Sequence, residues 1–537
     1  MNRREHVKKL NEKDTFDLLV IGGGATGGGI AVDAASRGLS VLLVEKNDFA
    51  EGTSSRSTKL VHGGVRYLEK AVKHLDKEQY SFVKEGLYER GVILKNAPHL
   101  TNKIQFVTPL YKWYELPYIF AGLKLYDILS GKMRLGKSRL LFRKETLEKL
   151  PTLNDQNLKG GVLYFDGQFN DARMAVMLVK TAVNQGAVAV NYMEVTDLIK
   201  ENNMVVGAHL KDNITGDTYT VNAKAVVNAT GAYADSIRKM DDENVEPVLK
   251  VSSGIHIILD KKFTPTDYGM MIPQTEDGRV IFVLPWEGHA LVGTTDDPSV
   301  VRDHPEVTNN EIEYVLKQIA RYFKTPPTKD DILSAWSGIR PLVKDPDATS
   351  TEEILRNHYI EVSKSKLVTI TGGKWTSYRH MAEDVVDRVI KEFSFNAKPC
   401  ITSDLKIAGG ENFNPEGNKL LQKKYNIDHD IALHLHKSYG SLAEEVINSC
   451  EKEKAFVRLE TGHPYVESEV YYCVRNEMVV HVVDFLIRRI PLGLVDIKAA
   501  KHASSKVLEI MAEELGWDKS RVDEELKLIS DRFDKAI

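Results

Sequence analysis

Short apolar runs and amphipathic stretches alternate through the first 400 residues or so of the chain. The continuously apolar run 16–21 predicts a strand that is buried on both faces of a parallel sheet, and 41–44 predicts a second one. Between them, residues 30–36 have the pattern of a helix that ends near Gly38. The N-terminal region therefore predicts a strand–helix–strand unit of a doubly wound α/β sheet.

The same hydrophobic pattern predicts further strands and helices and, near the C-terminus, an all-helical region. Strands are expected at 187–192, 205–210, 225–228, 255–259, 280–284, 290–292 and 367–371, and helices at 310–322 and 376–393. From about residue 402 strand patterns stop, and helical periodicity continues, as at 479–489 and 497–515. We expect an α/β fold with a Rossmann-like doubly wound domain, a β-rich domain and a C-terminal all-helical domain.

Composition narrows the class of protein. A chain of 537 residues with 42% hydrophobic and 28% charged residues is expected to fold into two or three domains. The net charge of −4 argues against general nucleic-acid binding. Cys400, Cys450 and Cys473 form no CxxC pair, which argues against a disulfide framework and a zinc site and suits a reducing cytosol. No apolar signal segment or run of about 18 apolar residues occurs, so we expect any membrane contact to be peripheral.

A glycine-rich turn follows the first predicted strand. Gly22, Gly24 and Gly27 match the GxGxxG pattern, in which glycines permit a tight turn, a close approach to a pyrophosphate and close helix–strand packing. The helix that follows directs free N–H groups toward the phosphates. Glu45 ends the second strand 23 positions after Gly22, where a carboxylate can accept hydrogen bonds from a ribose diol. Strand, turn, helix and acid together predict a dinucleotide site.

Two later segments favour FAD over NAD. Residues 228–231 (NATG) and 372–374 (GGK) each close a buried strand with small residues, which allows a long ligand to lie against the backbone at the switch point of the sheet. For either segment alone, an ordinary tight turn without a ligand contact is the alternative interpretation.

Several longer motifs resemble one family. Segment 52–67, GTSSRSTKLVHGGVRY, is followed in order by NDAR at 170–173, GTTD at 293–296, WSGIRPL at 336–342 and GGKWTSYR at 372–379. These resemble the FAD-dependent glycerol-3-phosphate dehydrogenases, from about residue 14 into the C-terminal helical region. LKLYD at 123–127 and IRKMDD at 237–242 are most similar to the mitochondrial type. A transit peptide and calcium-binding EF-hands are not recognised, so we expect a bacterial cytosolic enzyme without calcium control.

The resemblance implies an enzyme with one FAD, no metal, and a division of the chain into three domains. The FAD-binding domain is expected at 14–75, 155–245 and 345–395, the substrate domain at 76–154 and 246–344, and the helical domain at 402–537. We assign the cofactor to residues in the motifs and at the strand ends: Gly22, Gly24, Thr26, Gly27, Glu45, Lys46, Thr53, Ser54, Ser55, His62, Gly63, Ala229, Thr230, Gly231, Gly372, Gly373, Trp375 and Thr376.

The implied reaction is oxidation of sn-glycerol 3-phosphate to dihydroxyacetone phosphate. The resemblance implies that Arg66 and Arg340 lie beside the flavin, and because the guanidinium group matches phosphate oxygens we assign both to the substrate. Lys374 is assigned to the phosphate or the flavin, and Tyr67 to a hydrogen bond with the substrate. For any single arginine, an ion pair at the protein surface is the alternative to a role in substrate binding. We predict that Arg340 and Lys374 also act in catalysis.

Hydride transfer from C2 to flavin N5 leaves a hydroxyl proton that a positioned base should accept. His256, in the apolar strand 254–258, is our first candidate, although a histidine there is more often structural. His62 is the second candidate and has contact with the isoalloxazine as its alternative role.

Segment 113–144 combines aromatic and basic residues. Residues 124–144 contain seven basic residues and one acid, a net charge of +6, and Trp113, Tyr114, Tyr118, Ile119 and Phe120 precede them. Such a mixture suits an anionic lipid surface at the inner face of the cell membrane, where a quinone would take the electrons. A solvated charged face beside a core helix is the alternative. The oligomeric state stays open, with a homodimer as one option.

Two other functions compete with the dehydrogenase. One is a glycerol-3-phosphate oxidase of the same fold, which reduces oxygen to peroxide, although the insertion familiar from those oxidases is not recognised here. The other is a non-catalytic flavin-binding sensor with a helical interaction module. Arg66, Arg340 and Lys374 together argue against the sensor.

Overall fold

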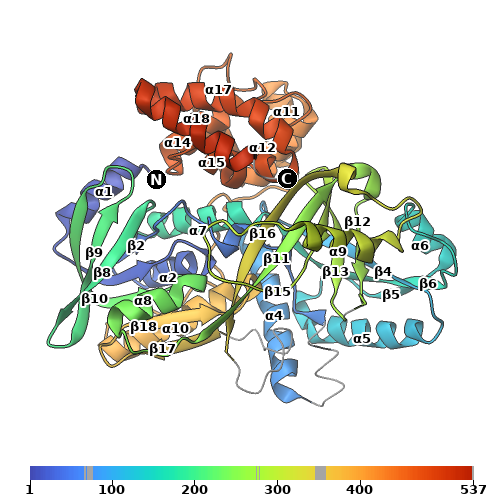
Figure 1. Cartoon of the computed structure of the whole chain (residues 1–537), viewed down its shortest axis with the longest axis horizontal. Helices are drawn as coiled ribbons and strands as arrows, with labels where there is room; N and C mark the ends of the chain where they lie inside the picture. The colour runs from blue at the N-terminus through green and yellow to red at the C-terminus, as the bar shows by residue number, and fades with distance from the viewer. Residues whose placement is uncertain (66–67, 69–75, 274, 277, 345–357, 535–537) are drawn as a thin grey trace.

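The computed structural model of the chain describes all residues except 66–67, 69–75, 274, 277, 345–357 and 535–537. Two large sheets lie side by side, and a group of helices covers one end of both (Figure 1). The predicted residues Arg66 and Tyr67 lie outside the described part of the chain. None of the helices in that part is both long and apolar enough to cross a bilayer.

The first sheet carries the predicted nucleotide-binding unit. Its strands are β1 (Thr15–Ile21), β2 (Val41–Val44), β7 (Val188–Val190), β8 (Met193–Glu201), β9 (Met204–Asp212), β10 (Thr218–Asn228), β17 (His358–Val362) and β18 (Val368–Gly372). The central order is β18-β10-β1-β2-β7, with all four pairings parallel, and β17 and β9 extend it in antiparallel pairings. The parallel centre brings the carboxyl ends of its strands to one edge.

Helices cover one face of this sheet and strands cover part of the other. Helices α2 (Ala25–Ser36), α7 (Asp171–Asn184) and α10 (Tyr378–Phe393) share one hydrophobic core with β1, β2 and β10. On the opposite face, β8, β9 and α8 (Ala234–Asp241) contribute to a second core with the other side of β1. The predicted doubly wound arrangement is confirmed.

Helix α2 begins five residues earlier than the hydrophobic pattern predicted. Its first turns contain Gly27, Gly28 and Gly29, which have low helix propensity and no side chain to show periodicity. The structure requires glycine there because a Cβ on Gly28 would lie 3.3 Å from Leu178 and one on Gly29 would lie 2.9 Å from Tyr378. Close packing of α2 against α7 and α10 therefore determines where the helix starts.

The second sheet is mostly antiparallel. Its strands are β3 (Leu60–Val61), β4 (Thr101–Leu110), β5 (Arg139–Phe142), β6 (Gly160–Phe169), β11 (Leu249–Leu259), β12 (Tyr268–Ile272), β13 (Ile281–Trp286), β14 (His289–Gly293), β15 (Asp297–Pro298) and β16 (Ile332–Val343). Helices α5 (Glu115–Leu129), α6 (Arg143–Lys149) and α9 (Asn309–Ala320) accompany it, with α4 (Lys77–Asn96) between the sheets in Figure 1. β3 and β6 fall inside predicted FAD-binding segments but pair within this second sheet, and the exact domain boundaries stay predictions.

The C-terminal region is helical, as predicted. It contains α11 (Gly417–Tyr425), α12 (His429–Tyr439), α13 (Ala443–Ile447), α14 (Glu467–Asn476), α15 (Val482–Asp484), a π-helical turn (Phe485–Arg489), α16 (Leu492–Val495), α17 (Ile497–Leu515) and α18 (Lys519–Phe533). No strand longer than a single bridge occurs between residues 402 and 534. N-terminal helix α1 (Arg3–Glu12) lies at the side of the first sheet in Figure 1, where it contacts β7.

Candidate active site

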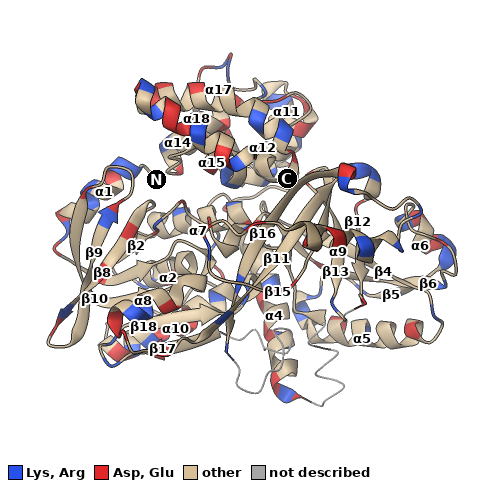
Figure 2. Cartoon of the chain, in the orientation of Figure 1, with Lys and Arg blue, Asp and Glu red and all other residues tan. Residues whose placement is uncertain are grey.

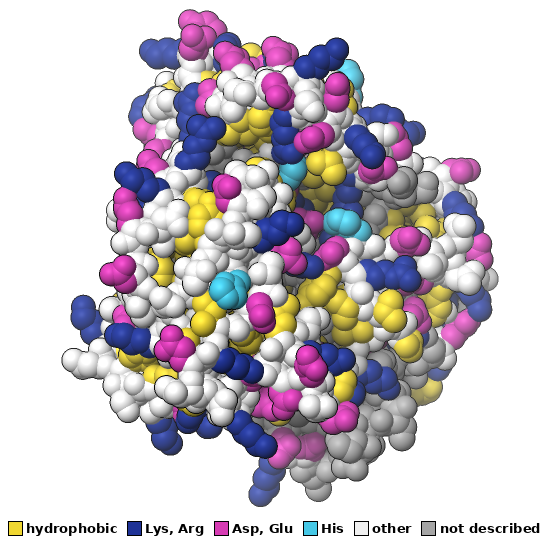
Figure 3. Space-filling view, turned by 60° about the vertical axis from the view of Figure 1, so that its left-hand side comes forward, with side chains coloured by type: hydrophobic (Ala, Val, Ile, Leu, Met, Phe, Trp, Pro, Cys, Tyr) yellow, Lys and Arg dark blue, Asp and Glu magenta, His cyan; other side chains and the backbone are white. Residues whose placement is uncertain are grey.

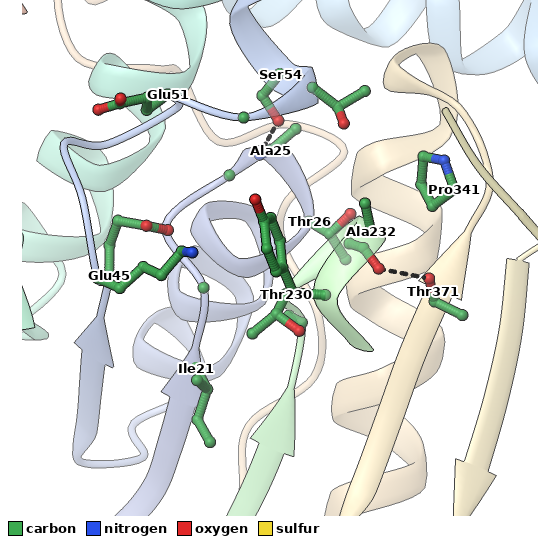
Figure 4. Close-up of a pocket in the computed structure, with 18 of the residues that line it drawn as sticks. Ile21, Ala25, Thr26, Glu45, Glu51, Ser54, Thr230, Ala232, Pro341 and Thr371 are labelled. Carbon is green, nitrogen blue, oxygen red and sulfur yellow. Dashed lines mark hydrogen bonds between the residues drawn. The ribbon is translucent and has the colours of Figure 1, made fainter. Parts of the chain in front are cut away.

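A cavity of about 410 Å³ lies at the carboxyl ends of β1, β2, β10 and β18. Figure 4 shows Glu45 on one side of it and Thr371 on the other, with Thr26 and Thr230 between them. Most of the predicted cofactor residues line this cavity: Gly22, Gly24, Thr26, Glu45, Lys46, Thr53, Ser54, Ala229, Thr230, Gly231, Gly372, Gly373 and Trp375. The position agrees with the switch point at which open α/β sheets bind ligands.

The glycine turn forms the floor of the cavity. Gly22 has φ of +113°, and a Cβ there would lie 2.6 Å from the carbonyl oxygen of Ala229 on the neighbouring strand end. A Cβ on Gly27 would lie 1.8 Å from the oxygen of Gly22, so any side chain would displace α2 from β1. Ser54 Oγ accepts a hydrogen bond from Ala25 N at 2.9 Å, which ties the following loop to the N-terminus of α2 (Figure 4).

Glu45 is held where a ribose diol was predicted. Its Oε2 accepts from Gly23 N at 2.7 Å and its Oε1 accepts from Asn47 N at 3.0 Å. Burial raises the pKa of this carboxyl. Each carboxylate oxygen can accept more than one hydrogen bond, so both can still accept from ligand hydroxyls.

A bridge between the two sheets, which the sequence did not indicate, closes the rim above Glu45. Asp303 Oδ1 accepts from Lys46 Nζ at 2.8 Å and from the hydroxyl of Tyr233 at 2.5 Å. Lys46 Nζ also lies 4.0 Å from the centre of the Tyr233 ring. Asp303 and its neighbour Arg302 come from the connection between β15 and α9, so no local motif linked them to the cavity.

Arg340 lies on β16 between Ile339 and Pro341, which both line the cavity. Its Nη1 donates to Ser253 O at 3.0 Å and to Asp296 Oδ1 at 3.2 Å. Its Nη2 donates to Thr294 Oγ1 and Thr295 O, both at 2.9 Å. The guanidinium is therefore held by acceptors of the second sheet. Arg340 itself is not among the described residues that line the cavity.

His256 lies on β11, opposite Trp336 of β16, and its side chain is buried. Its Nε2 lies 2.9 Å from Thr58 Oγ1, and its ring stacks on Trp336 with 5.4 Å between centres. Nδ1 is buried and has no hydrogen-bond partner among the described residues. Burial lowers the pKa of His256 well below its usual value, and the charges of Arg340 and Lys59 lower it further, so the ring is neutral.

Lys374 and Trp375 extend the cavity toward α10. Both line it, and Trp375 Nε1 donates to Ser54 O at 2.8 Å. Lys374 Nζ lies 3.9 Å from the centre of the Phe82 ring. The loop after β2 and the loop after β18 are therefore joined at the cavity.

The remaining predicted cofactor residues lie beside the cavity but are not among its described lining residues: Gly27, Ser55, His62, Gly63 and Thr376. The backbone N–H of His62 donates to Thr376 Oγ1 at 3.1 Å, which ties two of the predicted segments together. Gly63 N donates to the hydroxyl of Tyr126 at 2.7 Å.

A buried ion pair that the sequence analysis missed supports the loop beneath His256. Lys59 Nζ donates to Asp171 Oδ1 at 2.6 Å and to Ser55 O at 2.7 Å. It also lies 5.3 Å from the ring centres of both Trp286 and Trp336. Both residues stand inside motifs already singled out, STK and NDAR, so the motif positions were the available signal.

Comparison with known proteins agrees with this geometry. Residues 17–379 match the family described as FAD dependent oxidoreductase, and residues 400–522 match the C-terminal domain of alpha-glycerophosphate oxidase. Mitochondrial glycerol-3-phosphate dehydrogenase of Rattus norvegicus is 44% identical over 98% of this chain and 74% of its own length. The chain belongs to the FAD-dependent glycerol-3-phosphate dehydrogenases. The mitochondrial enzyme of Arabidopsis thaliana is 45% identical over 96% of this chain and 85% of its own.

Solved structures extend the comparison to the whole architecture. The glycerol-3-phosphate dehydrogenase of Bacillus halodurans complexed with FAD has a TM-score of 0.81 and 34% identity, covering 99% of this chain and 97% of that chain. An L-alpha-glycerophosphate oxidase from Mycoplasma pneumoniae with FAD bound has a TM-score of 0.56 and 17% identity over 73% of this chain, which shows a shared fold alone. The predicted family, fold and cofactor are confirmed.

The residues that line the cavity fit FAD. Gly22 leaves no room for a Cβ beside Ala229, which suits the tight turn of a dinucleotide site, and Gly24 stands at the position where such sites bring the backbone close to a pyrophosphate. The N-terminus of α2 presents backbone N–H groups, and Glu45 supplies acceptors for a diol. The cavity continues to Lys374 and Trp375, so it extends well beyond the nucleotide-binding turn.

Proposed function

We propose that the protein oxidises sn-glycerol 3-phosphate to dihydroxyacetone phosphate and passes the electrons to a membrane quinone. The names of the relatives support the substrate. The observation that carries the proposal is the arrangement on β11 and β16. A buried neutral histidine, His256, and a held arginine, Arg340, stand on paired strands that face the loop lining the FAD cavity.

In this proposal the chain binds the phosphate and removes the proton. When bound, FAD supplies the hydride acceptor. Arg340 and Lys374 attract the phosphate dianion, with Arg66 as a further predicted contact. The hydroxyl proton passes to His256, either directly or through Thr58, whose hydroxyl can accept that proton and donate its own to Nε2. Because its pKa is lowered, His256 is unprotonated near neutral pH, and the same shift makes it a weaker base than a histidine in water.

Anaerobic addition of glycerol 3-phosphate to the purified protein tests the reaction. We expect the flavin absorbance band to bleach and to return when a quinone analogue is added. An oxidase would instead produce stoichiometric peroxide in air without any quinone. A sensor would bind the phosphate ester and leave the flavin oxidised. Either result would reject the proposed dehydrogenase reaction.

Membrane contact through segment 113–144 is part of the same proposal, because a quinone lies within the bilayer. Large apolar side chains project from this segment: Trp113 (69% exposed), Tyr114 (69%), Tyr118 (50%), Ile128 (69%), Leu140 (46%) and Phe142 (83%). Tyr118 and Ile128 belong to α5, Leu140 and Phe142 belong to β5, and the other two precede α5; the two elements are neighbours at the outer end of the second sheet. Lys132, Arg134 and Lys137 in the same segment are exposed. Exposed aromatics beside basic residues suit an anionic lipid surface.

The rest of the visible surface differs from that segment. Figure 3 shows Lys and Arg interspersed with Asp and Glu over the face that it displays. Figure 2 shows the same mixture of signs on the C-terminal helices. These mixed charges support a docking region confined to part of the molecule, with peripheral attachment at the inner face of the cell membrane as the proposed location.

A further inference from the structure

The C-terminal helical domain reaches the loop that follows β2. We call residues 46–56 the cofactor loop, because Lys46, Asn47, Ala50–Ser54 and Arg56 all line the FAD cavity. Figure 1 shows the end of the chain at the junction between the C-terminal helices and the two sheets. The contacts across this junction involve charged side chains that no part of the proposed reaction uses.

Asp48 anchors the cofactor loop to the helical domain. Its Oδ2 accepts from Arg488 Nε at 2.6 Å and from Arg489 Nη1 at 2.7 Å, and Arg489 Nη2 donates to Oδ1 at 2.9 Å. All three side chains are buried. Burial alone would raise the pKa of Asp48, but Arg489 and Arg488 outweigh it and hold that pKa well below its usual value. Arg488 also pairs with Asp484 and Arg489 with Glu477, so acids compensate both arginines and this part of the junction is structural.

A second group of charges lies beside the cofactor loop and is only partly compensated by acidic side chains. Arg56 Nη2 and Arg532 Nη1 each lie 3.4 Å from Nδ1 of His304. In the described part of the chain, neither arginine has a carboxylate within ion-pair distance. Glu51 lies nearby, but its oxygens are 3.7 Å from His304 Nε2 and 3.3 Å from Arg488 Nη2.

Two guanidinium groups that converge on one imidazole repel each other. Burial and the charge of Arg532 lower the pKa of Arg56 to about 10. Burial and Arg488 likewise lower the pKa of Arg532. Like charges that are partly removed from water are destabilising unless an anion accompanies them. Glu51 acts against both of these shifts and so compensates part of the positive charge, and a further negatively charged group beside Arg56 would stabilise the arrangement.

The FAD cavity offers such a group on the side where Arg56 lines it. Ser54, two residues before Arg56, is bonded to Ala25 N at the start of α2, where a pyrophosphate is expected. We propose that Arg56, His304 and Arg532 form an anion site for the pyrophosphate of FAD, which makes the C-terminal helical domain part of the cofactor site. The inference rests on the FAD of the family and is independent of the proposed substrate.

The affinity of the apoprotein for FAD tests this role. Arg532→Gln is compared with Lys527→Gln, which removes the same charge from an exposed position on the same helix, α18. FAD is titrated into the flavin-free proteins without substrate, and the quenching of flavin fluorescence gives Kd. We expect Arg532→Gln to weaken FAD binding at least about tenfold, and Lys527→Gln to leave it unchanged. Arg56→Gln should weaken it as well, and Arg532→Lys should retain most of the affinity.

Two further measurements distinguish a role of Arg532 in FAD binding from an effect on folding and from binding of free phosphate. Equal thermal unfolding midpoints of the apo forms of Arg532→Gln and Lys527→Gln would show that the helical domain is intact. If a variant cannot be prepared without flavin, the rate of FAD release on dilution gives the same comparison. Inorganic phosphate should compete with FAD more strongly in the wild type than in Arg532→Gln. Unchanged FAD affinity in Arg532→Gln would overturn the proposal, even if free phosphate still bound there.

Discussion

At the scale of single residues, burial determines the chemistry that His256 and Arg340 can perform. The environment of His256 excludes water and lies near two cations, which keeps the imidazole neutral. Arg340 is oriented by backbone and side-chain acceptors, so its position is determined before any substrate arrives. Preorganised groups of this kind act without reorganisation during the reaction.

Replacing the proposed base tests the first of these residues. His256→Asn should lower kcat by roughly 10²–10⁴-fold, since a positioned base contributes about that much. Flavin content should stay at the wild-type level because His256 does not line the FAD cavity in the described structure. Stopped-flow measurement of flavin reduction at several pH values gives both the rate of reduction and the flavin content. Reduction at the wild-type rate would exclude His256 and turn attention to His62.

Arg340→Ala should raise KM for glycerol 3-phosphate strongly. Loss of one partner of a desolvated charge pair typically costs about 2–5 kcal/mol. Activity on unphosphorylated glycerol, low from the start, should barely change, and it provides the internal control. Steady-state kinetics on both compounds makes the comparison. Equal losses on both would mean that Arg340 supports the second sheet or the flavin, as its bonds to Ser253 and Thr295 allow.

At the scale of elements, α5 and β5 present side chains that a water-facing surface would disfavour. Phe142 is 83% exposed and Ile128 is 69% exposed. Asp127, the single acid between residues 124 and 144, is buried and accepts hydrogen bonds from Ser138. The exposed charge of the segment is therefore almost wholly positive, although Arg139 and Arg143 pair with Glu145 and Asp155.

Co-sedimentation with anionic liposomes tests this surface. We expect the wild type to bind reversibly and less at high salt, and a variant with Lys132, Arg134, Lys137 and Arg139 changed to Glu to remain in solution. The matched control changes four exposed lysines of the helical domain to Glu: Lys419, Lys423, Lys424 and Lys437. If the first variant sediments like the wild type and the control does not, the helical domain carries the docking face.

Helix α1 shows how one buried histidine ties an element to the fold. Its His6 Nδ1 accepts a hydrogen bond from Ala189 N of β7 at 3.1 Å. Burial is the largest cause that lowers the pKa of His6 to about 4, and the charges of Lys9 and the N-terminal amine contribute to the same shift. Protonation would replace the acceptor with a donor facing Ala189.

The pH dependence of stability follows from that shift. Because the folded-state pKa lies below the unfolded value of about 6.5, the stabilisation is complete above pH 6.5 and is lost as pH falls toward 4. The full effect is about 3 kcal/mol. His6→Gln should flatten this part of the curve, as measured by the denaturation midpoint at pH 7, 5.5 and 4.5. Parallel curves for the two proteins would contradict the prediction.

At the scale of the whole molecule, three parts of the chain surround one cofactor. The first sheet supplies the glycine turn and Glu45, the second sheet supplies Asp303 at the rim, and the helical domain holds the cofactor loop through Arg488 and Arg489. Such enclosure retains a ligand by many non-covalent contacts. No tether is required for tight binding.

We therefore predict that FAD is bound non-covalently. Precipitation of the protein with acid should unfold all three parts and release free flavin into the supernatant. The absorbance spectra of the supernatant and of the redissolved pellet measure how much flavin each of them contains. Yellow colour that stays in the pellet would reveal a covalent bond, with His62 the first residue to examine by peptide mapping.

The sequence by itself determined the elements and motifs that depend on neighbouring residues. The strand–turn–helix unit with Gly22, Gly24 and Gly27, and the acid Glu45 that closes it, were predictable because local pattern and glycine spacing encode them. The helical C-terminal region was predictable from periodicity alone. The start of α2 was not, because its glycines are helical only through packing against α7 and α10.

The distant side chains that lie together at and beside the cavity could be identified only from the packing of the fold. Arg56 and Arg532 approach His304 across 248 and 228 positions of sequence, and Asp303 reaches Lys46 across 257. No local pattern records such pairs, because the packing of separate elements creates their distances. Burial, which sets the protonation of His256 and Glu45, likewise depends on what the rest of the fold places around each residue.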